Sequence, residues 1–163
     1  MKDPQDKKRH YVYLCGNITA DPESYAWRER FRKAVKDLPI VSLDPTLNSF
    51  NQDLIGTVST SNAIHDVVKT KAQRILRAKD YQLVKIASVV VVNLGFWSMG
   101  KPPIGTVQEL VWAHDIFYIP VIAITMGENN PYTKHAWIDE CCSAKVETLE
   151  EAVEMLKTFF LEF

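Results

Sequence analysis

The chain has 163 residues, 47% of them hydrophobic, and its 19 basic and 20 acidic side chains give a formal net charge of -1. This length and apolar content suffice for one domain with a buried core, and the interspersed charge gives no broad basic surface of the kind that binds nucleic acid. No apolar run approaches the roughly 20 residues of a membrane span, and the charged start of the chain lacks the apolar segment of a secretion signal. We therefore expect a cytoplasmic protein with a polar tail at residues 1–10 and one domain at residues 11–163, binding neither membranes nor nucleic acid.

The first half of the chain predicts two strands around a helix. Residues 11–15 (YVYLC) are a short β-branched and aromatic run that ends at Gly16, and residues 39–43 form a second such run. Between them, Asp21 followed by Pro22 predicts a helix start with Asp21 as the N-cap and Pro22 at the first helical position. The segment 44–62 is rich in Asn, Ser, Thr, Gly and Pro, which predicts a long loop of the kind that carries function.

The second half predicts three more strands separated by helices. Apolar residues keep a helical spacing over 63–87, with a break near Lys79, and again over 105–115. The runs 88–94 (SVVVVNL) and 119–125 (IPVIAIT) are continuously apolar, which is typical of strands buried on both faces. A short strand near 145–146 precedes a last helix at 149–160, which the capping-box pair Thr148 and Glu151 announces.

This alternation of strands and helices predicts a single-domain α/β fold with a doubly wound, flavodoxin- or Rossmann-like parallel sheet flanked by helices. Ligands of such sheets bind beyond the carboxyl ends of the strands, which here are Gly16, Asp44 and the segments 93–96 and 125–130. Neither G-x-G-x-x-G nor G-x-x-x-x-G-K-[ST] occurs in the sequence, so we expect no dinucleotide or nucleoside triphosphate held by those loops.

No pattern in the sequence predicts a metal site or a disulfide. Cys141 and Cys142 are adjacent and cannot form an ordinary disulfide with each other, and no C-x-x-C or Cys/His ligand spacing occurs. The four histidines show neither metal spacing nor a paired nucleophile. We therefore predict no metal site and no cofactor.

Glu109 stands near the start of the predicted helix 105–115 and has two interpretations. Thr106 and Glu109 have the spacing of a capping box, in which Thr106 is the N-cap and Glu109 the third helical residue. Alternatively, a carboxylate at this helix start opens onto the crevice beyond the buried strand 88–94, where free amides and the helix dipole would keep it ionised. In that case Glu109 could act as a nucleophile.

Asp80 also has two interpretations. It falls on the apolar stripe of the helix 63–87, where an unpaired charge is costly. It either caps a second short helix or pairs at the surface with Arg77 or Lys79, or it turns inward toward the crevice. Because the helix of Asp80 precedes the strand that leads to Glu109, the second interpretation gives two carboxylates at one edge, the usual equipment for cleaving a glycosidic bond.

Three segments of the sequence resemble one family. YLCGNIT on the first strand, RAKDYQLVKIASVVVVNL in the middle and GTVQELVWAHDIFYIPVIAI after it are similar to the nucleoside 2-deoxyribosyltransferase superfamily, which also contains nucleoside-monophosphate N-glycosidases. The resemblance covers residues 11–124. It implies that Glu109 is the nucleophile that attacks the anomeric carbon, and that Asp80 assists departure of the base.

The resemblance also implies a substrate, a reaction and an assembly. The expected enzyme transfers 2-deoxyribose between nucleobases through a covalent glycosyl-glutamate, takes a nucleoside or nucleotide and a free nucleobase as small-molecule partners, and forms a homo-oligomer, a dimer or larger. Trp112 and Phe117 are expected in the core or at the interface between subunits, and Tyr118 would also suit that interface. Family transferases often carry an acidic residue shortly before the nucleophile, where this chain has Ser98, Lys101, Pro102 and Pro103. Hydrolysis of a nucleoside 5-monophosphate or modified nucleoside, or binding without turnover, therefore stay open as alternatives.

Substrate binding is expected at the ends of the first, third and fourth long strands and in the loop before Glu109. Trp97 and Tyr132 are the aromatic residues placed best to contact an aromatic ligand. The full set of predicted substrate-binding residues is Tyr13, Cys15, Gly16, Asn17, Asn93, Ser98, Gly105 and Asn130.

Overall fold

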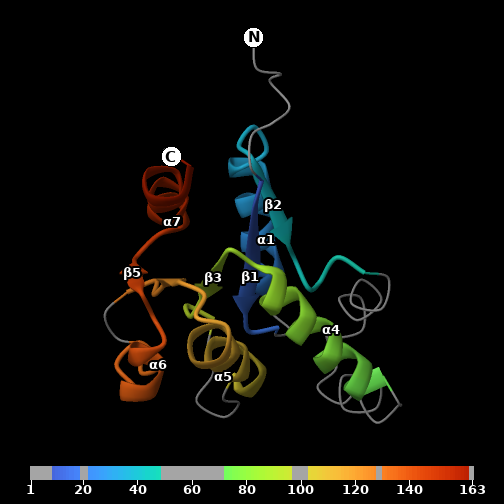
Figure 1. The fold of residues 1–163 in the computed structure, drawn as a ribbon. Coiled ribbons are helices and arrows are strands. Elements are labelled where there is room, and N and C mark those ends of the chain that lie inside the picture. Colours follow the sequence, from blue (N-terminus) through green and yellow to red (C-terminus); the bar gives the residue numbers. More distant parts are fainter. Residues whose placement is uncertain (1–8, 19–21, 49–71, 97–102, 128–129, 162–163) are drawn as a thin grey trace.

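A five-stranded parallel sheet forms the centre of the computed structural model, which describes residues 9–18, 22–48, 72–96, 103–127 and 130–161 (Figure 1). The strands are β1 (His10–Gly16), β2 (Ile40–Leu43), β3 (Val89–Asn93), β4 (Val121–Ile124) and β5 (Ala144–Val146). Their order across the sheet is β2-β1-β3-β4-β5. The chain leaves β1 toward one edge and returns to the other side of it with β3, so the switch in strand order lies between these two strands. The predicted doubly wound α/β fold is confirmed.

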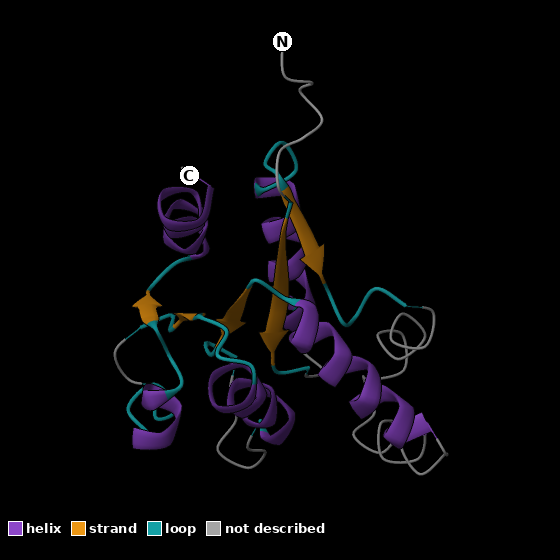
Figure 2. Cartoon of the chain, viewed as in Figure 1, coloured by secondary structure: helices purple, strands orange, loops and turns teal. Residues whose placement is uncertain are grey.

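Helices cover both faces of this sheet (Figure 2). They are α1 (Glu23–Ala34), α4 (Ala72–Ile86), α5 (Ile104–Val111), α6 (Ala136–Glu140) and α7 (Leu149–Leu156), and short π-helical turns extend α5 over Trp112–Ile116 and α7 over Lys157–Leu161. Alternate residues of a strand point to opposite faces, which divides the core in two. Tyr13 and Cys15 of β1 pack with α4, α5 and α6, whereas Val12 and Leu14 pack with α1 and α7.

The helix bounds differ from the sequence prediction in three places. α4 runs without interruption through Lys79, so the predicted break there is wrong, and residues 63–71 lie outside the described part. α1 begins at Glu23 with Pro22 at the N-cap, one residue later than predicted, and Asp21 is also outside that part. The short helix α6 was not predicted, because five residues are too few to show a helical period.

The start of α5 overturns the predicted capping box. Pro103 occupies the N-cap, no side chain caps the helix, and the buried Thr106 is its third residue. Glu109 is consequently the sixth residue of α5, beyond the first turn whose backbone N–H groups lack intrahelical partners. The box fails because Pro103 fixes the helix start upstream of Thr106.

The second predicted capping box, at the start of α7, is confirmed. The Glu151 amide donates to Thr148 Oγ1 at 3.2 Å, and the Thr148 amide donates to Glu151 Oε2 at 3.2 Å. Both bonds satisfy amides that the helix itself leaves unpaired.

We expect Thr148→Ala to lower the free energy of unfolding by about 1 kcal/mol, because it removes the acceptor for the Glu151 amide. Urea denaturation of the two proteins measures this difference. Thr158→Ala, at an exposed position of the turn after α7, is the control and should stay within about 0.5 kcal/mol of the wild type. Equal effects of the two changes would contradict the capping role.

Candidate active site

Glu109 lies where α5 packs against the carboxyl-terminal half of β1. Tyr13 Oη donates a hydrogen bond to Glu109 Oε1 at 2.9 Å, and Cys15 Sγ donates to Glu109 Oε2 at 2.9 Å. Tyr13 and Cys15 are two positions apart on one strand, so both side chains leave the same face of the sheet. Each carboxyl oxygen of Glu109 thus has its own donor, and the pair fixes the plane and direction of the carboxyl group.

The environment of Glu109 changes its protonation. Its pKa is raised from an ordinary value of 4.5 to about 7. Burial is the largest cause and the charge of Asp80 acts in the same direction, whereas the hydrogen bonds from Cys15 and Tyr13 and the charge of Arg28 oppose the rise. The prediction that free amides keep Glu109 ionised is therefore wrong. Glu109 lies past the first turn of α5, and desolvation has the largest effect on its pKa. Near neutral pH this carboxyl group exists in both forms.

The two donors themselves stay protonated. Burial, followed by the charge of Glu109, raises the pKa of the Tyr13 phenol and that of the Cys15 thiol well above their ordinary values. A neutral phenol and a neutral thiol can each donate one hydrogen bond. The raised pKa also means that Cys15 is not a reactive thiolate in this setting.

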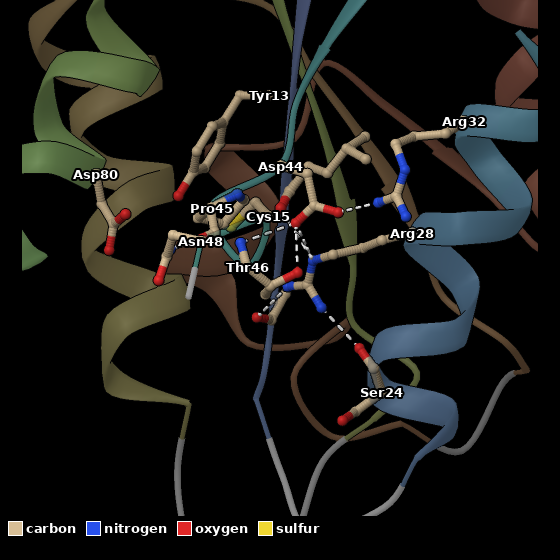
Figure 3. A network of polar contacts seen from close by, with 12 residues as sticks. Tyr13, Cys15, Ser24, Arg28, Arg32, Asp44, Pro45, Thr46, Asn48 and Asp80 are labelled. Atoms are coloured by element: carbon tan, nitrogen blue, oxygen red, sulfur yellow. Dashed lines mark hydrogen bonds and ion pairs between the residues drawn. The ribbon is translucent and has the colours of Figure 1, made fainter. Parts of the chain in front are cut away.

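Asp80 on α4 lies on the Tyr13 side of the polar network in Figure 3, and its charge acts on the Tyr13 phenol. Its side chain is 24% exposed and forms an ion pair with Lys79, with 3.2 Å between Lys79 Nζ and Asp80 Oδ1. Burial raises the pKa of Asp80, and Lys79 and Arg28 oppose the rise. The structure thus combines the two interpretations of the sequence: Asp80 pairs with Lys79, yet it is turned inward far enough for its charge to act on Glu109.

A buried arginine that the sequence analysis missed closes the carboxyl end of β1. Arg28 on α1 is 1% exposed, and its guanidinium donates to three backbone carbonyls, those of Ser24 at 2.6 Å, Gly16 at 2.8 Å and Leu14 at 3.4 Å. Its Nε also lies 3.8 Å from Asp44 Oδ1. Arg28 thereby ties α1, the end of β1 and the end of β2 together (Figure 3).

Asp44, directly after β2, is the acceptor of this network. Its Oδ1 receives the Thr46 amide at 2.9 Å and the Thr46 hydroxyl at 2.6 Å, and its Oδ2 pairs with Arg32. A signal was present in the sequence, since Arg28 and Arg32 are four residues apart and therefore share one face of α1. The end of β2 was predicted as part of the crevice, but its electrostatic partner was not identified.

Several other predicted binding residues have structural partners. Asn93 Oδ1 accepts the Gly95 amide at 2.9 Å. Asn130 donates to the Leu94 carbonyl and accepts the Tyr132 amide at 3.0 Å. A role in substrate binding stays a prediction for both.

Gly16 is needed where β1 and β3 come close together. A Cβ atom at this position would lie 3.2 Å from the Asn93 carbonyl oxygen and 3.3 Å from the Trp27 ring, which is tighter than ordinary van der Waals contact. Asn17 follows at the end of β1 and is partly exposed, and Gly105 is exposed in the first turn of α5. Ser98 and Trp97 lie outside the described residues, as does most of the predicted loop 44–62.

The predicted interface residues divide between core and surface. Trp112 is 5% exposed and meets Tyr81 edge-on in the core, with 5.1 Å between ring centroids. Phe117 is partly buried against this core, so of the two places expected for these rings the structure shows the core. Tyr118 is 85% exposed and stays a candidate.

Among the described residues, no group of three or more His, Cys, Asp and Glu side chains is arranged to hold a metal ion. Within the same ranges, no helix is both long and apolar enough to cross a bilayer.

The sequence itself matches no family model and no curated protein. The structure matches the 2-desoxiribosyltransferase of Leishmania mexicana with a TM-score of 0.64 at 16% identity, covering 93% of this chain and 99% of the other. It also matches the 2-deoxyribosyltransferase of Bacillus psychrosaccharolyticus with a TM-score of 0.59 at 15% identity, covering 87% and 89%. A CMP N-glycosidase of Clostridium botulinum gives a TM-score of 0.48 at 10% identity, covering 91% and 99%, which is too low to support an inference. The chain therefore has the fold of these two 2-deoxyribosyltransferases.

Proposed function

We propose that the protein is a nucleoside 2-deoxyribosyltransferase with Glu109 as nucleophile and Asp80 as its partner. One observation carries the proposal: both oxygens of the Glu109 carboxyl group are held by donors from β1, and the charge of Asp80 on α4 acts on the same carboxyl group. A capping or surface glutamate would not need two buried donors. The shared fold with two 2-deoxyribosyltransferases supports the same conclusion.

The chemistry follows from this geometry. An ionised Glu109 oxygen attacks the anomeric carbon of the nucleoside, the bond from that carbon to the base nitrogen breaks, and its electron pair leaves with the base. The oxocarbenium-like transition state is stabilised by the nearby negative charge. A nitrogen of a second base then attacks the same carbon and releases Glu109, so that two inversions give net retention.

Tyr13 and Cys15 orient the nucleophile in this scheme. Their hydrogen bonds leave the carboxyl group little freedom to rotate, which is the preorganisation that a displacement at one carbon atom requires. They also favour the ionised form, because both bonds lower the pKa of Glu109 against the effect of burial.

Hydrolysis is the second candidate, and one feature of the sequence favours it. The segment LGFWSMGKPP between β3 and α5 contains no acidic residue, whereas transferases of the family that the sequence resembles often carry one there. Water in place of the second base would release free sugar from the same glycosyl-glutamate. A 5-monophosphate preference would select the N-glycosidase alternative.

Incubation with deoxyadenosine plus free thymine, cytosine or hypoxanthine should yield exchanged nucleosides, detected by chromatography. Glu109→Gln should lower turnover roughly 100-fold or more while the protein stays folded, because it removes the nucleophile. The control is Glu140→Gln, at an exposed position of α6, which should leave turnover unchanged. Accumulation of only free base and sugar would replace transfer by hydrolysis, and full activity of Glu109→Gln would exclude the mechanism.

Tyr13→Phe and Cys15→Ala should each lower kcat/KM roughly tenfold or more, the effect of losing one hydrogen bond to a charged group. Because each lost bond had lowered the pKa of Glu109, the acid limb of the pH–rate profile should also move to higher pH. Cys15→Ser keeps a donor and should be milder than Cys15→Ala. A fall in kcat/KM without any movement of the acid limb would point to general packing damage instead.

The pKa of Glu109 predicts opposite pH dependences for activity and stability. The proposed nucleophile must be ionised, so kcat/KM should rise with pH and reach half its plateau near pH 7. The raised folded-state pKa means that the proton on Glu109 stabilises the folded protein below about pH 4.5, and that this stabilisation is lost as the pH rises through about 7. Melting temperatures of wild type and Glu109→Gln across this range should therefore change in favour of the variant as the pH rises; a constant difference would contradict the assigned pKa.

A further inference from the structure

Lys79 is placed between the carboxylate of Asp80 and the end of β2. Its Nζ donates to the Pro45 carbonyl at 2.7 Å and lies 3.2 Å from Asp80 Oδ1. The Lys79 side chain is 33% exposed, so this ion pair is screened less than a pair on the open surface. One ammonium group thus contacts two elements that both border the site.

The carbonyl that holds Lys79 belongs to a fixed segment. Pro45 stands between Asp44 and Thr46, and all three residues are buried. The Asp44 carboxylate is held by Arg28, Arg32 and Thr46. The second partner of Lys79 is therefore anchored by the buried network, which restrains a side chain that would otherwise have many rotamers.

Among the charges around Asp80, that of Lys79 lowers the pKa of Asp80 the most. Glu109 on α5 is a second acid near it, and Tyr13 and Cys15 of β1 are neutral groups in the same field. Arg28 on α1 acts on Asp80 more weakly than Lys79 does. Among the described residues, Lys79 is the cation that forms an ion pair with Asp80, and it opposes the effect of burial on the pKa of Asp80.

We propose that Lys79 is a positioning residue that holds Asp80 in its ionised form, so that Asp80 accepts a hydrogen bond from a donor group of the nucleoside instead of giving a proton to the leaving base. This inference rests on the proposed function and names the part that Asp80 takes in it. The electron pair of the broken glycosidic bond stays on the base, which then takes its proton from water. Glu109 forms and later loses its bond to the sugar as before.

The test compares Lys79→Met and Lys79→Gln with Lys79→Arg. The Met variant loses the charge and the hydrogen bond to Pro45, the Gln variant loses the charge but keeps an N–H donor, and the Arg variant keeps both. Lys85→Met, at an exposed position in the last turn of the same helix, is the matched control. Melting temperatures verify that each variant is folded.

We expect Lys79→Met and Lys79→Gln to lose roughly tenfold in kcat/KM near neutral pH, the usual size of the loss of one interaction with a charged group. The loss should shrink as the pH rises, because Asp80 without its cation ionises only at higher pH. Lys79→Arg and Lys85→Met should resemble the wild type. Carboxyl carbon NMR should show the Asp80 titration at higher pH in Lys79→Gln than in the wild type.

Three results would overturn the inference. Full rescue by Lys79→Gln would show that the tether to Pro45 matters and the charge does not. Higher activity of the uncharged variants near neutral pH, extending further into the basic range, would make Asp80 a proton donor. An unchanged Asp80 titration in Lys79→Gln would remove the ion pair as its cause. The NMR measurement needs no turnover, so it tests Lys79 even where an inactive wild type has already refuted the proposed function.

Discussion

The site depends on the two hydrogen bonds that join β1 to Glu109. Tyr13 and Cys15 can both reach this carboxyl group because alternate side chains of a strand leave the same face of the sheet. A slip of one residue in the register of β1 would present Val12 and Leu14 instead, and neither could donate a hydrogen bond. Packing of Val12 and Leu14 on α1 and α7 fixes the register of β1. It therefore also determines that Tyr13 and Cys15 point toward α5.

A second constraint holds the end of that strand. Arg28 binds the carbonyls of Leu14 and Gly16, which bracket Cys15 in the chain. A buried guanidinium is costly unless its charge is paired and its N–H groups are bonded, and Asp44 supplies the counter-charge. Strand, helix and the segment after β2 are thus joined by one ionic network, which borders the site without touching Glu109.

Much of the fold could be predicted because apolar runs and helical spacing are local signals. The buried strands, their order with the helices and the capping box of Thr148 and Glu151 all followed from such patterns. The start of α5 could not be settled in this way, because Pro103 and Thr106 are both acceptable near a helix start and the spacing of residues does not distinguish them. Glu109 and Asp80 were found by their unusual place among apolar residues, whereas Arg28 was missed because an arginine on an amphipathic helix is usually solvated.

The two carboxyl groups of the site differ in their surroundings more than in their chemistry. Glu109 is half-buried and held by neutral donors, so its charge is costly and its pKa rises to about 7. Asp80 meets a cation directly, which opposes the same effect of burial. Two neighbouring acids have different pKa values when one of them has a counter-charge and the other does not. The charge on Asp80 then raises the pKa of Glu109, so a lysine on α4 influences the proposed nucleophile on α5 without contacting it.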